Sequence, residues 1–290
     1  MPLTATAGRA AAAESAFRAA VEAIGHAKQA SGLQPDPAAG PRPSPLIGDE
    51  LTPLVTTLGS LESKRLAASP IWARVLVDQL AAHGVGEGSF VGAGFSGSFP
   101  GLNLAVIAAC DALGAELVAV SSVTASTFGA NQPGFTWPEI EARLSEDGLI
   151  RRATVAVSVG GSKDRGDDLD AEGLGLARRI ARESAAALGA ILLAPVGFED
   201  AVETRLRLYR ERARGRPIAL YVNSGGTDAS LGRSEAVLRL ESGFVSPGRF
   251  DTSGERGVVA RLAEVGVPVL MLLNVRGLAL RWGIPLSGSG

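Results

Sequence analysis

The stretch SFVGAGFSGSFPGLNLAVIAACDAL, residues 89–113, contains a complete strand, turn and helix pattern. Its first seven residues form the short apolar run typical of a buried strand, and residues 102–113 place apolar side chains three and four positions apart, as a helix does. Pro100 comes near the first helical position, where its missing N–H is harmless. The pattern therefore predicts the strand-to-helix unit from which α/β sheets are built.

The turn of this unit is GFSGSFPG, residues 94–101. A strand-to-helix turn rich in Gly and Ser leaves backbone N–H groups to hold an anion or a carboxylate. We therefore expect Ser96, Gly97, Ser98 and Phe99 to contact a ligand.

The chain beyond residue 45 repeats this alternation. Strands are predicted at 89–95, 116–121, 154–159, 190–194, 217–222 and 267–272, and helices at 71–83, 100–113, 138–144, 171–188, 199–213 and 254–265. Helices interleaved with short apolar strands favour a mainly parallel sheet covered on both faces. The predicted fold is a single three-layer, Rossmann-like α/β domain over residues 46–290.

Residues 1–45 have a different composition. Residues 8–30 are Ala-rich and helix-prone, with Phe17, Val21 and Ile24 at helical spacing, and residues 31–45 carry the prolines and glycines of a linker. We expect an outlying helical arm that packs on the domain, dimerises, or leads away from a membrane anchor.

Composition excludes several classes of protein. The 290 residues are 46% hydrophobic, enough for a substantial core, and 28 Lys+Arg nearly balance 30 Asp+Glu, so charge gives no reason to expect a nucleic-acid partner. No run of about 18 apolar residues could span a bilayer, and the start lacks a secretory signal pattern, so we expect a soluble chain. The only cysteine, Cys110, lies in an apolar helical pattern and is expected to be buried.

Polar, glycine-rich loops follow four of the predicted strands, at 94–101, 121–131, 158–168 and 223–232. Ligands of such sheets bind at the carboxyl ends of the strands, so we expect one composite pocket. The alternative is that Gly and Ser only form turns there. The further residues expected to contact the ligand are Ser126, Asn131, Gly160, Gly161, Asp164, Asn223, Ser224, Gly225 and Gly226.

The motifs of several enzyme classes are missing. GFSGS lacks the last glycine of a nucleophile elbow, and His26 and His83 lie in the arm and at the far edge of the sheet, which argues against a histidine-dependent serine hydrolase. The phosphate-binding and dinucleotide-binding glycine patterns are absent too. Ser96 and Ser98 are therefore interpreted as hydroxyl donors around an anionic oxygen.

The run KDRGDDLDAE, residues 163–172, holds five carboxylates of the kind that suits Mg²⁺ or Ca²⁺. Its spacing matches no calcium loop, and acidic residues ahead of a helix commonly cap it, so no cofactor or metal is firmly implied. Asp164, directly after SVGGSK, is the carboxylate we expect to have a function.

Residues 47–70 fit neither the helix nor the strand pattern and place Thr56, Thr57, Lys64 and Arg65 just ahead of the first helix of the domain. The two cations could pair with an anionic ligand, or they could be surface charges. Asn274, after the last predicted strand, could reach the same edge or cap the final helix.

A set of ordered motifs also resembles a known family. The motifs are LIGDELTPLVTTLGSLESKR (46–65), SGSFPGLNLAV (96–106), SSVTASTFGANQPGFTW (121–137), SVGGSKDRG (158–166), NSGGT (223–227) and LLNVRGLALRWGIPL (272–286). Together they are similar to the poly-gamma-glutamate system proteins, encoded in bacteria beside capsule synthesis and export genes for poly-γ-glutamate. The resemblance implies this pathway and association with a membrane synthase complex through an N-terminal membrane-spanning segment. The arm begins where that segment would end, so we expect either a trimmed chain or a member without the anchor.

The sequence therefore leaves two functions open. One is an accessory protein that binds poly-γ-glutamate or a glutamate-like or phosphate-bearing anion, alone or as an oligomer. The other is an amide-bond hydrolase or transferase acting on the polymer or its precursor through a loop serine, Ser96 or Ser98, with Lys64 or Asp164 as the base. The second requires an amine or a carboxylate about 3 Å from the serine hydroxyl.

Overall fold

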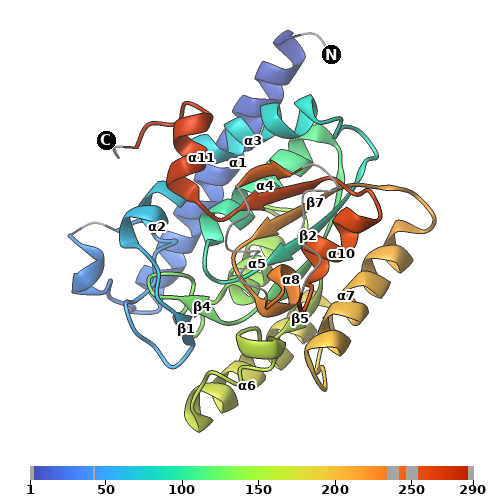
Figure 1. Ribbon diagram of the computed structural model, residues 1–290. Coiled ribbons are helices and arrows are strands. Elements are labelled where there is room, and N and C mark those ends of the chain that lie inside the picture. Colours follow the sequence, from blue (N-terminus) through green and yellow to red (C-terminus); the bar gives the residue numbers. More distant parts are fainter. Residues whose placement is uncertain (1–2, 42, 234–241, 246–253, 287–290) are drawn as a thin grey trace.

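A computed structural model describes residues 3–41, 43–233, 242–245 and 254–286 and contains a seven-stranded, mostly parallel sheet with helices on both faces (Figure 1). The sheet order is β6-β5-β3-β2-β7-β9-β8, and β8 runs antiparallel to β9. Its strands are β2 (Phe90–Phe95), β3 (Glu116–Ser122), β5 (Thr154–Ser158), β6 (Ile191–Leu192), β7 (Ile218–Ser224), β8 (Gly243–Val245) and β9 (Val269–Leu272). The predicted three-layer, Rossmann-like fold is confirmed.

The helices fall into three groups by the core that they share. The helices of the largest core are α1 (Leu3–Ala30), α3 (Ile71–Ala82), α4 (Pro100–Leu113), α5 (Trp137–Glu146) and α11 (Val275–Arg281), together with Leu66 and Ala67 from a shorter helix. The helices of the second core are α7 (Phe198–Ala213) and α10 (Val258–Glu264). Helix α6 (Ala171–Leu188) covers β5 beside α5 and forms a third, smaller core.

The chain changes direction across the sheet at β2. From β2 it proceeds through β3 and β5 to β6 on one side, and it then crosses back to β7, on the other side of β2. The loops that leave the carboxyl ends of β2 and β7 therefore diverge, and a crevice opens between them. This is the place where open α/β sheets bind ligands.

Four short elements frame this edge: α2 (Leu61–Ala67), α8 (Asp228–Leu231) and a parallel pair formed by β1 (Val55–Thr57) and β4 (Ala125–Ser126). The pair places Thr57 beside Ser126. Helix α2 packs at the start of α4, where Gly101 lies so close to the Ala67 carbonyl that a Cβ would come within 2.2 Å of that oxygen. The segment before the first predicted helix is thereby held at the carboxyl edge.

Most predicted elements are present with small changes in their bounds. Helices 100–113 and 171–188 match the structure, whereas strand 190–194 shrinks to two residues and helix 254–265 to seven. Antiparallel β8 and the short β1, β4 and α8 were not predicted, because two to four residues are too few to show a period. Cys110 is buried, as expected.

The N-terminal helix packs on the rest of the domain. Along α1, Ala10, Ala13, Phe17, Ala20 and Ile24 recur every three or four residues and are all buried, and α1 packs on α3 and α4. Packing on the domain is one of the three alternatives that the sequence left open for this segment. Small alanines let α1 approach its neighbours closely.

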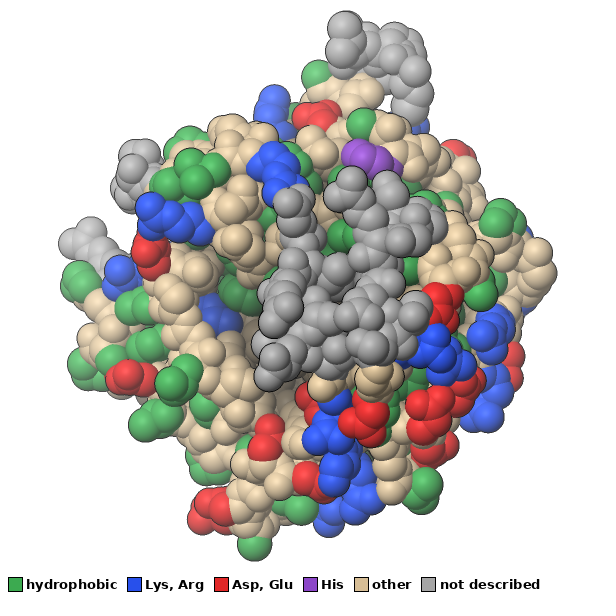
Figure 2. All heavy atoms as spheres, viewed as in Figure 1, with side chains coloured by type: hydrophobic (Ala, Val, Ile, Leu, Met, Phe, Trp, Pro, Cys, Tyr) green, Lys and Arg blue, Asp and Glu red, His purple; other side chains and the backbone are tan. Residues whose placement is uncertain are grey.

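The outer face shown in Figure 2 carries acidic and basic side chains side by side. Arg261 of α10, for example, donates to Glu199 of α7 at 2.9 Å and also bonds Glu203.

No helix within the described residues is both long enough and apolar enough to cross a membrane.

We predict that Phe17→Ala lowers the free energy of unfolding by about 3–5 kcal/mol, because it opens a cavity between α1 and the domain. Urea unfolding followed by circular dichroism measures this change. Glu22→Ala, on the exposed face of the same helix, is the control and should change stability by less than about 0.5 kcal/mol. Equal effects of the two substitutions would contradict the placement of α1 in the core.

Candidate functional site

A cavity of about 220 Å³ opens at the carboxyl edge where the chain changes direction. The residues that line it are Thr56, Thr57, Leu58, Gly59, Lys64, Ser96, Ser98, Phe99, Thr124, Ser126, Gly161, Ser162, Asp168, Gly226, Thr227 and Asp228. All four of the polar loops contribute, so the expected composite pocket is present. We call it the Lys64 pocket.

Lys64 is the most unusual residue of this pocket. It is only 4% exposed, although it carries an amine, and its Nζ donates to the Ser98 carbonyl and lies 2.6 Å from Ser126 Oγ. The amine also lies 4.0 Å from the centre of the Phe99 ring, a favourable cation–π position. Within the described part of the chain, no carboxylate forms an ion pair with it.

Burial lowers the pKa of Lys64 from 10.5 to about 7. Removal of a charge from water disfavours the charged form, and here no neighbouring carboxylate restores it. Near neutral pH the amine is therefore divided between its charged and neutral forms. A charged amine can hold an anion, and a neutral one can accept a proton.

Three glycines make room for the polar groups of the pocket. A Cβ on Gly59 would come within 2.9 Å of Ser126 Oγ and 3.0 Å of Lys64 Cε. Gly225, at φ +99°, lies against Ser96 Oγ, and Gly160, at φ +84°, lies against Thr124 Oγ1. The glycines in these loops thus allow side-chain hydroxyls and the amine to approach the backbone closely.

Three of the backbone N–H groups in the turn after β2 are bonded within the protein. The N–H of Ser96 donates to the Ser224 carbonyl, that of Gly97 to the Thr124 carbonyl, and that of Ser98 to Ser96 Oγ at 3.2 Å. These bonds tie the loops after β2, β3 and β7 together. These three N–H groups are therefore not available to a ligand, and Ser96, Ser98 and Phe99 of the turn line the pocket.

Among the residues that the structure describes, no amine or carboxylate bonds the hydroxyl of either serine proposed as a nucleophile. Ser96 Oγ accepts the N–H of Ser98, and Ser98 Oγ accepts the N–H of Ser126 at 3.1 Å. Lys64 reaches Ser98 only at its carbonyl. The serine hydroxyl that the amine does reach belongs to Ser126, which the sequence placed only among the ligand contacts.

Asp164 forms a buried ion pair and lines a separate cavity of about 410 Å³ instead of the Lys64 pocket. Its buried carboxylate pairs with Arg205 of α7 at 2.7 Å and accepts from Ser158 Oγ at 2.8 Å, while Arg205 donates to the same hydroxyl at 2.9 Å. It does not line the Lys64 pocket. The pair anchors the loop after β5 to α7.

This anchored loop is strained. Lys163 and Asp164 have φ values of +53° and +63°, a region that non-glycine residues rarely occupy. The Lys163 N–H donates to Asp228 and the Ser162 N–H to Asp168, each at 2.9 Å. Such strain persists only where surrounding contacts enforce it, and here it brings Ser162 and Asp168 to the rim of the pocket.

Three further predicted residues lie elsewhere. Arg65 is exposed and donates to the Ala39 carbonyl at 3.0 Å. Asn131 is buried and exchanges hydrogen bonds with the backbone of Asp49. Asn274 caps α11 by accepting the N–H of Gly277 at 2.9 Å, the alternative role that the sequence allowed. None of the three contacts the cavity.

The remaining predicted residues either line the pocket or lie near its lining residues in the chain. Thr56, Thr57, Lys64, Ser96, Ser98, Phe99, Ser126, Gly161 and Gly226 line the pocket. Gly97, Gly160 and Gly225 lie next to lining residues in the chain without lining the cavity, and Asn223 and Ser224 lie three and two positions before Gly226. His26 and His83 lie outside it, and His83 stacks on Phe244.

Sequence reasoning missed Leu58, Gly59, Thr124, Ser162, Asp168, Thr227 and Asp228 as lining residues. Thr124, Ser162, Thr227 and Asp228 lie inside the four predicted loops, so their polarity was a usable signal. Asp168 belongs to the acidic run, where capping was the expected role; that role falls to Asp170, which accepts the Gly173 N–H at 2.7 Å. Within the described residues, no group of three or more His, Cys, Asp or Glu could hold a metal ion.

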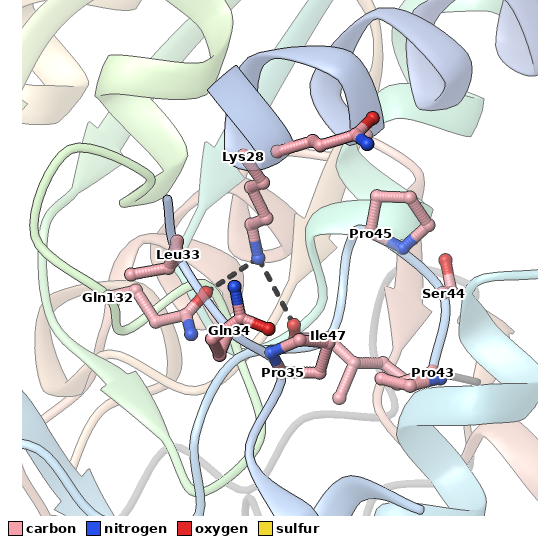
Figure 3. A pocket seen from close by; sticks show the side chains of 11 residues that line it. Lys28, Leu33, Gln34, Pro35, Pro43, Ser44, Pro45, Ile47 and Gln132 are labelled. Carbon is pink, nitrogen blue, oxygen red and sulfur yellow. Dashed lines mark hydrogen bonds between the residues drawn. The ribbon is translucent and has the colours of Figure 1, made fainter. Parts of the chain in front are cut away.

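A second hollow lies between α1 and the linker (Figure 3). Lys28 points into it and donates to the carbonyl of Ile47 at 3.2 Å and to Gln132 Oε1 at 2.6 Å. Burial lowers the pKa of Lys28 to about 8, and the Asp49 carboxylate opposes this shift. Because these acceptors already hold the amine, and prolines form much of the wall, we interpret this hollow as the junction that fastens the linker.

We compared the chain with protein-family models, with curated proteins and with solved structures, and none of them matches it. The candidate site therefore rests on the geometry described above.

We predict a pH signature of Lys64 in stability. Between about pH 7 and 10.5 the unfolded chain keeps the Lys64 proton and the folded chain releases it, so the stability contributed by this site rises with pH. The stability of the wild type minus that of Lys64→Met should therefore rise from pH 7 to 9, by at most about 1.4 kcal/mol per pH unit.

Denaturant titrations at each pH measure this difference. Lys163→Met is the matched control, because the Lys163 side chain is nearly half exposed, and its curve should stay parallel to that of the wild type. A Lys64→Met curve that is also parallel would show that the amine is not perturbed.

We also predict that Arg205→Met destabilises the protein by about 3–5 kcal/mol, because the carboxylate of Asp164 would remain buried without its partner. Asp164→Asn combined with Arg205→Met should recover much of the loss. Thermal unfolding of the single and double variants measures both effects, and additive losses would contradict a direct pair.

Proposed function

We propose that this chain is an accessory component of a bacterial poly-γ-glutamate system and that the Lys64 pocket binds a carboxylate-bearing, glutamate-like ligand. The pathway rests on the resemblance of the sequence motifs. The ligand class rests on the pocket.

The arrangement of the motifs supports a shared function. Five of the six motifs contribute lining residues: Lys64, Ser98, Ser126, Gly161 and Gly226 come from five separate stretches of the chain. The sixth motif forms the end of β9 and helix α11, which packs on α2, the helix of Lys64. The residues that carry the resemblance therefore gather at and behind one cavity.

The observation that carries the ligand class is the buried amine of Lys64 without a carboxylate partner. A buried charge is stabilised by a counter-charge, and a ligand carboxylate in the cavity would supply one. The hydroxyls of Ser96, Ser98 and Thr124 line the same cavity and can donate to its second oxygen.

The pocket also carries two carboxylates, Asp168 and Asp228, from the loops after β5 and β7. A ligand with both a carboxylate and an ammonium group would match an amine and carboxylates in one cavity better than a phosphate would. The volume of about 220 Å³ is below the range for drug-sized ligands and suits one glutamyl unit. A terminal glutamyl residue fits this description.

An accessory protein could use this pocket to hold the polymer. The resemblance implies work beside a membrane synthase and export complex, and a pocket for a terminal unit would allow the chain to hold one end of the polymer. No catalytic step is required for this role.

We predict that L-glutamate or a short γ-glutamyl oligomer raises the melting temperature at pH 6.5. At a ligand concentration 100 times Kd the stabilisation would be about 2.7 kcal/mol, which corresponds to several degrees. Lys64→Met should remove the shift and Lys163→Met should keep it.

The shift should weaken as the pH rises from 6 to 8.5, because the ammonium form of Lys64 is lost near pH 7. Glutaramide, a neutral analogue, and inorganic phosphate are the comparison ligands. Absence of any shift, or a shift that Lys64→Met retains, would reject this ligand and this site.

A further inference from the structure

The contact between Lys64 and Ser126 has the geometry of a base and a nucleophile. Lys64 Nζ lies 2.6 Å from Ser126 Oγ, within the distance needed for proton transfer. Both side chains are at most 5% exposed in total, and both line the pocket. Solvent therefore reaches the pair only through the cavity where a ligand would lie.

The other contacts of Lys64 orient its lone pair. The Ser98 carbonyl can only accept, so one N–H of the amine must point to it. The Phe99 ring face, 4.0 Å from Nζ, also favours an N–H. In the neutral amine, which has two N–H groups, the lone pair is then left for the hydroxyl proton of Ser126.

Two more features prepare Ser126 for chemistry. Its backbone N–H donates to Ser98 Oγ, which holds the residue in place and leaves the Ser98 hydroxyl proton free to donate. Gly59 lies so close that a Cβ there would crowd both Ser126 Oγ and Lys64 Cε. Such close packing restricts the serine and the amine to their present approach.

We propose that Ser126 and Lys64 form a catalytic dyad for acyl transfer, in which Ser126 Oγ is the nucleophile and Lys64 Nζ is the base. The dyad goes beyond ligand binding, and only its choice of a γ-glutamyl substrate rests on the proposed function. It also replaces Ser96 and Ser98 as the nucleophile of the enzyme alternative.

The proposed acyl transfer begins at the Ser126 hydroxyl. Lys64 Nζ takes the proton of the Ser126 hydroxyl as Oγ bonds to the carbonyl carbon of an amide, and the carbonyl oxygen becomes an oxyanion beside the Ser98 hydroxyl. The C–N bond then breaks, Lys64 returns the proton to the leaving amine, and an ester on Ser126 remains. Water or an acceptor amine attacks this ester, giving its proton to Lys64, and Ser126 regains a proton from Lys64 as it leaves.

The proposal is compatible with the anion-binding role, because the two use different protonation states of one residue. Acyl transfer to water leaves a carboxylate, which the ammonium form of Lys64 would hold as product. Binding of an anion should therefore weaken as pH rises through neutrality, and nucleophilic attack should become faster. These opposite trends separate the two proposals.

Few other charged groups face Lys64. Glu62 and Arg65 share its helix, and Glu62 pairs with Arg276 of α11 at 2.7 Å. Asp168 and Asp228 line the same cavity, and Asp228 pairs with Arg233 at 3.4 Å. All six are carboxylates or guanidinium groups, and Lys64 is the amine among them. A titration near pH 7 in the reaction would thus report the amine.

A fluorophosphonate probe tests the dyad, because it marks an activated serine by forming an O–P bond with loss of fluoride. The full chain is incubated with the probe from pH 5.5 to 9, labelling is followed by intact mass, and the site is mapped by peptide mass spectrometry. We expect one label on Ser126, with a rate that rises about tenfold per pH unit below neutrality and levels off above about pH 7.

Substitutions distinguish the role of Lys64 as a base from its role as a positive charge. Lys64→Arg keeps a cation but cannot accept a proton, so it should lower the labelling rate by at least about 100-fold while keeping part of the glutamate-induced thermal shift. Ser126→Ala should abolish labelling. Ser184→Ala, which removes a buried hydroxyl on α6 that has no hydrogen-bond partner, and Lys163→Met are controls that should label like the wild type.

Several outcomes would overturn the dyad. They are a label on Ser96 or Ser98, no label at all, a rate that does not change with pH, or full labelling in Lys64→Arg. If the Lys64 variants fail to fold, the labelled residue and the pH profile of the wild type decide alone. A ligand-induced thermal shift without labelling would retain the binding proposal and reject the dyad.

Discussion

The hydrogen bonds of Lys64 join three segments that lie far apart in the sequence: helix α2, the turn after β2, and β4. The amine reaches the Ser98 carbonyl and the Ser126 hydroxyl together, so both must converge on one buried point. The parallel pairing of β1 with β4 and the packing of α2 on α11 bring the segments there. The pocket is the space that remains around this junction.

The loop after β5, which also lines the pocket, is held in place by a buried ion pair. The loop after β5 carries two residues at positive φ, a conformation that would relax without support. Buried Asp164 and Arg205 supply that support, and Asp228 adds a bond to the Lys163 N–H. A charge pair with no contact to the cavity thus places Ser162 and Asp168 on its rim.

Hydrophobic periodicity predicted the long elements well, because helices such as 100–113 and 171–188 repeat their pattern over three turns or more. The four polar loops were also assigned to one edge correctly, since parallel strands end on the same side. The sequence could not decide among the three alternatives for the arm, because its partners, α3 and α4, are identified only in the folded chain. The ion pair of Asp164 could not be predicted, because its partner Arg205 is 41 positions away and the local sequence gives no sign of it.

The sequence by itself determined the fold class, the edge of the sheet that carries the polar loops, and the set of residue types available there. Only the tertiary structure decided which of two chemically similar residues enters the pocket. Lys64 enters the pocket while Arg65 faces the linker, because consecutive residues of a helix point about 100° apart and the docking of α2 selects one direction. Likewise, Ser126 meets the amine and Ser96 does not, because strand pairing between β1 and β4, and not the local Gly and Ser pattern, sets which hydroxyl lies within 2.6 Å.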